Sequence, residues 1–170
     1  MVMMSNTHDL MKIVETAAVK NGVDPDLAMA IASVESSWDA WAVRFEPNWK
    51  YFKTPEVYAK DLHITVETET ALQACSYGLM QIMGSVAREL GFTKSLLQLA
   101  DPFIAADFST RKLATLVKKH PTELDAIAAY NAGKPRLTEA GKYVNQGYVD
   151  KVTKVLGELR VFVAAGKGDS

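Results

Sequence analysis

The sequence predicts a single, mostly α-helical domain with at most a small β element between residues 41 and 77. Of its 170 residues, 48% are hydrophobic and 23% are charged, which suffices for one globular domain with its own core. Several segments place apolar residues at helical spacing between capping signals, and no stretch sustains the period of two that strands require. We assign the domain to residues 1–165 and expect a flexible tail at residues 166–170.

Capping signals set the expected helix boundaries. An apolar stripe at residues 10–18 is followed by Asn21 and Gly22, which are typical of helix ends. Each of four later starts joins a capping residue to a proline or an acidic residue: Asp24-Pro25, Thr54-Pro55, Asp101-Pro102, and Thr122 with Asp125. Apolar spacing also predicts helices at residues 79–90 and 148–159, whereas residues 65–70 show no clear pattern and stay unassigned.

Composition limits the possible partners and cofactors. The single cysteine, Cys75, cannot form an internal disulfide, and no His or Cys spacing resembles a zinc site, so we expect neither a metal nor another cofactor. The net charge of -1 creates no broad field that would attract nucleic acid or anionic lipid. Residues 1–10 lack the features of a secretory signal, and no run is long enough to span a bilayer. We expect a soluble protein made in the cytoplasm without stable membrane association.

Three separated segments carry polar residues that point to one site. Glu35 and Ser36 follow the apolar stripe of the second predicted helix, a Gly-Leu-Met-Gln sequence occupies residues 78–81, and an Ala-Tyr-Asn sequence occupies residues 129–131. In this order and approximate spacing, the segments resemble the lysozyme-like domain of soluble lytic transglycosylases and goose-type lysozymes. The resemblance covers residues 10–155.

The resemblance implies an enzyme that cleaves the glycan strands of bacterial peptidoglycan. It implies that Glu35 is catalytic and that five further residues bind the glycan: Ser36, Gln81, Met83, Tyr130 and Asn131, with Tyr130 close to the acid. In the implied reaction, Glu35 protonates the bond between N-acetylmuramic acid and N-acetylglucosamine, and then accepts the proton of the muramyl C6 hydroxyl. That hydroxyl closes onto C1 as a 1,6-anhydro sugar, so water is not the nucleophile. The stretch between Glu35 and Gly78 is longer than in compact members, and no roles are carried over to it.

The chemistry of glycoside cleavage independently favours Glu35 as an acid. A glycosidic oxygen is a poor leaving group until an acid protonates it as the bond breaks. Such an acid needs a raised pKa, and a carboxyl group on an apolar helix face beside aromatic residues has a route to one. Desolvation there disfavours the carboxylate form.

Two other functions use the same residues. If a second carboxylate such as Glu46 faced Glu35, it could activate water, and the protein would be a hydrolytic lysozyme similar to the goose type. Ion pairing of Glu46 with Arg44 or Lys50 is the simpler explanation, and we favour it. Asp39 and Asp101 are weaker candidates for a second carboxylate. The third function is a noncatalytic module that binds peptidoglycan or builds a virion.

Several of the expected glycan-binding residues also have ordinary structural explanations. Gln81 and Asn131 could bridge backbone groups, because amides often satisfy local donors and acceptors. Met83 could fill the core as readily as it lines a groove. The aromatic residues between Trp38 and Phe52 could stack on sugars, although packing is their more frequent role.

We expect the protein to act on the cell wall, which lies outside the cytoplasmic membrane, although it is made in the cytoplasm. The Val-Arg-Phe-Glu-Pro sequence at residues 43–47 is similar to phage-encoded members of the family. We therefore expect a bacteriophage protein, an endolysin or a virion-associated enzyme, that reaches the wall through a holin or within a virion. We expect it to act as a monomer.

Overall fold

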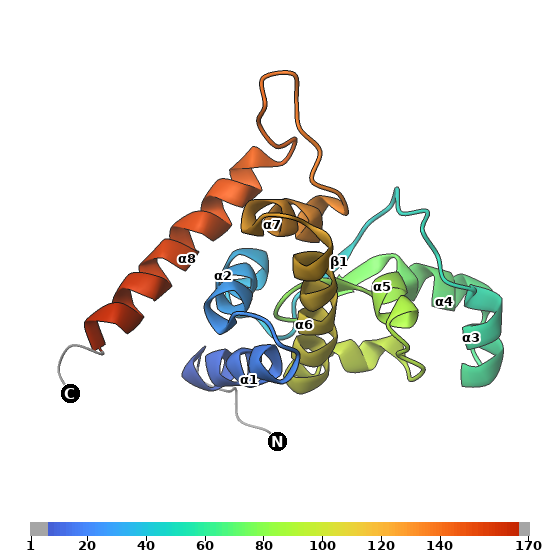
Figure 1. Ribbon diagram of the computed structural model, residues 1–170. Helices are drawn as coiled ribbons and strands as arrows, with labels where there is room; N and C mark the ends of the chain where they lie inside the picture. The colour runs from blue at the N-terminus through green and yellow to red at the C-terminus, as the bar shows by residue number, and fades with distance from the viewer. Residues whose placement is uncertain (1–6, 167–170) are drawn as a thin grey trace.

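Helix α6 (Pro102–Lys119) stands at the centre of the computed structural model, which describes residues 7–166 (Figure 1). On one side of it lie α1 and α2, with α8 on the far side of α2 and α7 across the upper end of α6; the bounds of α1, α2, α8 and α7 are Thr7–Lys20, Pro25–Ser36, Gln146–Gly166 and Glu123–Ala132. On its other side lie α3, α4 and α5, which span Pro55–Leu62, Val66–Gln73 and Gly84–Glu89. A 3-10 helix, η1 (Leu96–Ala100), precedes α6. The prediction of a mostly α-helical domain is confirmed.

Capping residues begin three of the helices where the sequence predicts them. Three predicted caps accept a hydrogen bond from a backbone amide two or three residues later: Asp24, Asp101 and Thr122. Such a bond satisfies one of the amides that a helix start leaves free. Thr54 forms no such bond and has a φ of 37°, so Pro55 alone marks the start of α3. The unassigned residues 65–70 contain the cap and first turn of α4.

The small sheet is antiparallel in the order β1-β2-β3, with bounds Val43–Phe45, Cys75–Tyr77 and Ile82–Met83. The first two strands lie in the range expected for β structure, residues 41–77, and the third lies beyond it. That part of the prediction is wrong because residues 82–83 had been assigned to a helix.

The predicted helix at residues 79–90 is wrong in its first half. Residues 78–81 form the turn between β2 and β3, and only Gly84–Glu89 is helical. The turn has left-handed backbone at both ends, with a φ of 68° at Gly78 and 49° at Gln81, which no α-helix can continue through. The apolar spacing arises instead because this turn is buried on more than one side.

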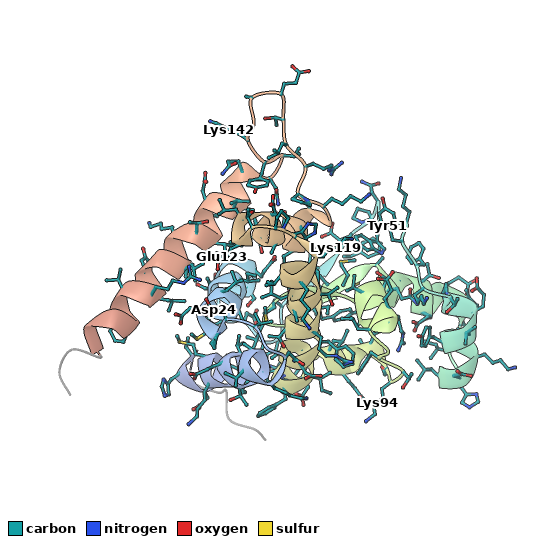
Figure 2. The ribbon with its side chains drawn as sticks, in the orientation of Figure 1. Asp24, Tyr51, Lys94, Lys119, Glu123 and Lys142 are labelled. Atoms are coloured by element: carbon teal, nitrogen blue, oxygen red, sulfur yellow. The ribbon has the colours of Figure 1, made fainter. Side chains whose placement is uncertain are left out.

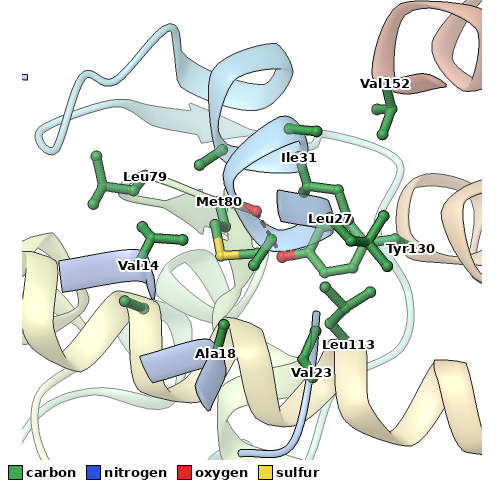
Figure 3. Packing of buried hydrophobic residues seen from close by; sticks show 14 of the residues in the cluster. Val14, Ala18, Val23, Leu27, Ile31, Leu79, Met80, Leu113, Tyr130 and Val152 are labelled. Atoms are coloured by element: carbon green, nitrogen blue, oxygen red, sulfur yellow. Dashed lines mark hydrogen bonds between the residues drawn. The ribbon is translucent and has the colours of Figure 1, made fainter. Parts of the chain in front are cut away.

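Two buried clusters meet at that turn. The larger cluster joins α1, α2, α6, α7 and α8 around Leu79 and Met80, and Figure 3 shows part of it. The smaller cluster contains Tyr77 and Ile82 together with residues of α5 and η1. A fully buried aliphatic side chain contributes about 1.5–3 kcal/mol, so both clusters hold the turn in place. The sheet is thereby fixed to the helices that surround α2.

A buried ion pair joins α4 to α5. Arg88 donates from Nε and Nη2 to the two carboxylate oxygens of Glu69, at 2.8 and 3.0 Å. Its remaining Nη1 donates to the carbonyls of Phe92 and Lys94, both at 2.7 Å, and Gln73 donates to Glu69 at 2.9 Å. A buried charge is tolerated only when it is paired and hydrogen-bonded in this way.

Helix α8 extends into the predicted tail. Gly166 is the last residue of α8, and residues 167–170 of the predicted tail lie outside the described residues. Among the helices of residues 7–166, none has the length and apolar character needed to cross a bilayer.

Replacing Gly84 by Ala should destabilise the fold, because α5 begins against the backbone of α4. A Cβ at this position would lie 2.5 Å from the carbonyl oxygen of Leu72 and 3.0 Å from the Cα of Gln73. Overpacking of this kind lowers the free energy of unfolding by about 1–3 kcal/mol, which urea titration would measure. Gly157→Ala in α8 is the control, since outside the backbone of its own helix and its chain neighbours no atom lies within 4 Å of its added Cβ. Equal stability of both variants would contradict the close approach.

Candidate active site

Glu35 lies in the last turn of α2, on the lining of a pocket of about 680 Å³. It follows Ile31 by one helical turn and therefore shares the face that α2 buries. The helix ends at Ser36, and Ser37 then adopts a left-handed conformation with a φ of 51°. The Ser36 hydroxyl donates to the carbonyl of Leu79 at 2.8 Å, which fastens the end of α2 to the β2–β3 turn.

One carboxylate oxygen of Glu35 has a hydrogen-bond donor in Tyr148. The hydroxyl of Tyr148, in the first turns of α8, donates to Glu35 Oε1 at 2.8 Å across a sequence separation of 113 residues. Figure 1 shows α8 running beside α2, which brings the two residues together. The bond favours the charged form of the acid and so lowers the pKa of Glu35.

Lys112 of α6 supplies a positive charge near Glu35. Its Nζ donates to the carbonyl of Tyr130 at 2.8 Å and lies 3.8 Å from the centroid of the Tyr130 ring. Burial lowers the pKa of Lys112 to about 8, while the charge of Glu35 acts in the opposite direction. Below that pH the ammonium group stays charged, and it lowers the pKa of Glu35 in turn.

Burial has the largest influence on Glu35 and raises its pKa above the ordinary value of 4.5. The hydrogen bond from Tyr148 and the charges of Lys112 and Arg44 oppose this shift without cancelling it. Glu35 therefore keeps its proton to a higher pH than an exposed glutamate does. Once the proton leaves, three groups are in place to stabilise the carboxylate. This combination suits a residue that acts as an acid and then as a base.

The sheet supplies one wall of the pocket. Its register sets Arg44 of β1 opposite Ser76 of β2, and Ser76 opposite Met83 of β3. Directly opposed residues project from the same face of a sheet, and all three line the pocket. The Met83 side chain is almost fully buried, so it closes the base of this wall rather than extending from it.

Gln81 also lines the pocket, and its amide holds the β2–β3 turn. Its Oε1 accepts a hydrogen bond from Ser76 at 2.8 Å, and its Nε2 donates to the carbonyls of Ala42 and Gly78, each at 3.0 Å. These bonds support the left-handed backbone at Gln81. The bridging role given as an alternative is therefore present, and contact with a glycan stays a prediction.

The segment between β1 and α3 adds aromatic side chains to the pocket. Trp49 and Tyr51 line it with their rings edge to face, 5.4 Å between centroids. The indole of Trp49 donates to the hydroxyl of Ser85 at 3.0 Å, which ties this segment to α5. Figure 2 shows Tyr51 on the side of α6 where α5 lies. Two of the six aromatic residues between Trp38 and Phe52 are thus placed where a sugar could contact them.

Glu46 lies in the same pocket as Glu35 and is paired. Its Oε1 is 2.6 Å from the Nε of Arg44, the ion pair that the sequence favoured. The weaker candidates do not line the pocket: Asp39 accepts a hydrogen bond from the amide of Trp41, and Asp101 caps α6.

The end of α7 brings Tyr130 and Asn131 to the pocket. Tyr130 is 3% exposed, and its hydroxyl donates to the carbonyl of Met80 at 2.9 Å (Figure 3). Burial, and to a smaller extent the charge of Glu35, raise the pKa of Tyr130. Tyr130 lines the same pocket as Glu35, but its hydroxyl binds the turn and not the acid. Asn131 is exposed, and its Oδ1 accepts a hydrogen bond from Asn145 at 3.0 Å.

The structure brings most of the predicted site residues to one pocket, namely Glu35, Glu46, Gln81, Met83, Tyr130 and Asn131. Ser36 is absent from the described lining, because its hydroxyl is used at the end of α2. Sequence reasoning missed Lys112 and Tyr148. Both residues belong to predicted helices. Their only distinguishing feature in the sequence is a polar group within an apolar pattern, and such a pattern does not predict which residue the group will contact.

Glu35 is thus a half-buried carboxyl group at a helix end, with a hydrogen-bond donor on one oxygen and a pocket beside it, an arrangement that suits general acid catalysis. The chain belongs to the transglycosylase SLT domain family, whose model matches residues 12–152. The match includes Glu35 and the two other motif segments. Membership supports peptidoglycan as the substrate and an activity of the lytic-transglycosylase type.

Removing either partner of Glu35, by Tyr148→Phe or Lys112→Met, should move the alkaline limb of the pH profile to higher pH. An acid catalyst must be protonated, so kcat/KM falls as pH rises through the pKa of Glu35. Both groups lower that pKa, and it rises when either is lost. Tyr148→Phe should also lower kcat about tenfold, because a hydrogen bond to a charged group contributes ~1.5 kcal/mol. Turnover of purified peptidoglycan at a series of pH values would measure both effects.

Lys118→Met is the matched control, since Lys118 is exposed on the same helix as Lys112. It removes the same charge and should leave the limb where it is. A limb that stays in place in both site variants, or moves to lower pH, would contradict the electrostatic account of Glu35.

Proposed function

We propose that this chain is a peptidoglycan lytic transglycosylase in which Glu35 acts first as general acid and then as general base. The observation that carries the proposal is the environment of Glu35. Burial holds its proton, while Tyr148 and Lys112 stabilise the carboxylate that remains after proton transfer. A residue used twice in one reaction needs both forms to be accessible near the working pH.

In the first step, Glu35 gives its proton to the oxygen that links C1 of N-acetylmuramic acid to N-acetylglucosamine. The C1–O bond breaks, the N-acetylglucosamine leaves with a hydroxyl group, and positive charge develops at C1. In the second step, the muramyl O6 bonds to C1 and its proton passes to the Glu35 carboxylate. The product ends in a 1,6-anhydro sugar, and the acid is restored without a water molecule.

The state of Glu46 supports this reaction over hydrolysis. Hydrolysis with inversion requires a second carboxylate that is free to take a proton from water. Glu46 faces the same pocket, but its oxygen is 2.6 Å from Arg44, and an adjacent positive charge makes a carboxylate a weaker base. The pocket thus offers Glu35 as the acid, while Glu46, the second carboxylate that the sequence suggested, is held by Arg44.

The proposed setting is bacterial cell-wall lysis by a phage protein. The enzyme would reach the wall through a holin, as an endolysin does, or within a virion. The similarity of residues 43–47 to phage-encoded members supports this setting, and the family supports the wall as the target.

Glu35→Gln should abolish lysis of purified sacculi while the protein stays folded. The amide keeps the size of the side chain but can neither give up nor regain the proton, and loss of general acid catalysis alone removes about 10²–10⁴-fold in rate. Turbidity loss of sacculi would measure the rate, and circular dichroism would verify the fold. Glu15→Gln, the same change on the exposed face of α1, should lyse normally. Normal lysis by Glu35→Gln would overturn the assignment and favour a noncatalytic module.

Digested sacculi should yield muropeptides that end in 1,6-anhydromuramic acid, for the wild type and for Glu46→Gln alike. Mass spectrometry separates these ends from reducing ends, because hydrolysis adds a water molecule and ring closure does not. Reducing ends from the wild type that disappear in Glu46→Gln would replace the transglycosylase with a goose-type-like lysozyme.

A further inference from the structure

The pocket wall that follows α7 carries two exposed cations, Lys134 and Arg136. Within the part of the chain that the structure describes, neither side chain forms an ion pair or a hydrogen bond. Lys134 comes four residues after Tyr130, whose ring lies beneath Lys112. Lys134 and Arg136 therefore line the same pocket as Glu35, and they follow Tyr130 closely in the sequence.

A hydrogen-bonded hairpin holds these cations. Residues 133–145 leave α7 at Gly133, and the amide of Val144 donates to the carbonyl of Arg136 at 2.9 Å. The hydroxyl of Tyr143 donates to Asp125 of α7 at 2.8 Å, which anchors the returning arm. The hairpin projects beyond α7 in Figure 1. The backbone that carries Lys134 and Arg136 is thus held in place before a ligand arrives, which reduces the entropy lost on binding.

The other charges of the pocket are distributed differently. Arg44 on the sheet wall is neutralised by Glu46, and Lys112 lies beside Glu35. The remaining acid of the lining, Glu89, is exposed on α5 and belongs to a different wall. Apart from Lys112 beside Glu35, the cations of the described lining that have no ion pair therefore lie on the wall formed by the hairpin.

The proposed substrate has anionic groups that suit this wall. Each muramyl residue that carries a peptide stem places several carboxylates beside the glycan strand. Arg binds carboxylates through a planar pair of donors, and Lys adds a mobile point charge. We propose that Lys134 and Arg136 bind carboxylates of the peptide stem and so give the enzyme a preference for stem-bearing strands. This inference rests on the proposed function, because it takes peptidoglycan as the ligand.

The test compares native sacculi with sacculi whose carboxylates have been converted to amides, which keeps the glycan and the stems but removes their negative charge. Wild-type enzyme should show a kcat/KM about fivefold higher on native sacculi, on the order expected for two exposed ion pairs. The preference should shrink as salt is added. In the double variant Lys134→Gln, Arg136→Gln, the ratio between the two substrates should fall toward one.

Lys142→Gln is the matched control, because Lys142 is exposed on the same hairpin (Figure 2) and is not part of the pocket lining. It should keep the wild-type ratio. A double variant with the wild-type ratio, or a wild type that cuts both substrates equally, would overturn the inference while leaving the proposed function intact.

Sedimentation of Glu35→Gln with the same two substrates separates the two proposals. Stronger binding to native sacculi that is lost with Lys134→Gln and Arg136→Gln supports the hairpin site even if the wild type cleaves nothing. Equal binding to both substrates contradicts it, whatever the cleavage assay shows.

Discussion

The pKa of Glu35 is set by two opposing effects, burial of its carboxyl group and stabilisation of its charge, and the rest of the structure maintains both. Burial at the end of α2 holds the proton, while Tyr148 from α8 and Lys112 from α6 stabilise the charge that its departure leaves. Without the first effect the group would be ionised before it met a glycosidic oxygen. Without the second, its proton transfer would leave an unsupported charge in a poorly solvated place.

The β2–β3 turn holds the helices around Glu35 in position. It receives the hydroxyl of Ser36 from the acid's own helix and that of Tyr130 from α7, at Leu79 and Met80 respectively. Gln81 then holds the turn in a left-handed backbone conformation. The Gly-Leu-Met-Gln segment therefore sets the distance between α2, α7 and the sheet wall. Its backbone role explains why it accompanies the acid even where its side chains point into the fold.

Sequence signals predicted the features of this fold that depend on residues close together in the sequence. The caps at Asp24, Asp101 and Thr122 fixed three helix starts, because capping is a bond between near neighbours in sequence. The turn at residues 78–81 escaped prediction because buried apolar residues at helical spacing also arise when a hairpin is packed on several sides. Lys112 and Tyr148 escaped because their roles depend on how α6 and α8 pack near Glu35. Such contacts span most of the chain and leave no pattern within a single helix.

The central claim is that one carboxyl group breaks the glycosidic bond without water as the nucleophile. Digestion of purified sacculi in ¹⁸O-labelled water, with mass spectrometry of the new muramyl ends, tests it most directly. We expect these ends to carry no ¹⁸O, because O6 of the same sugar closes onto C1. One ¹⁸O atom at C1 of each new end would contradict it and show that water completes the reaction.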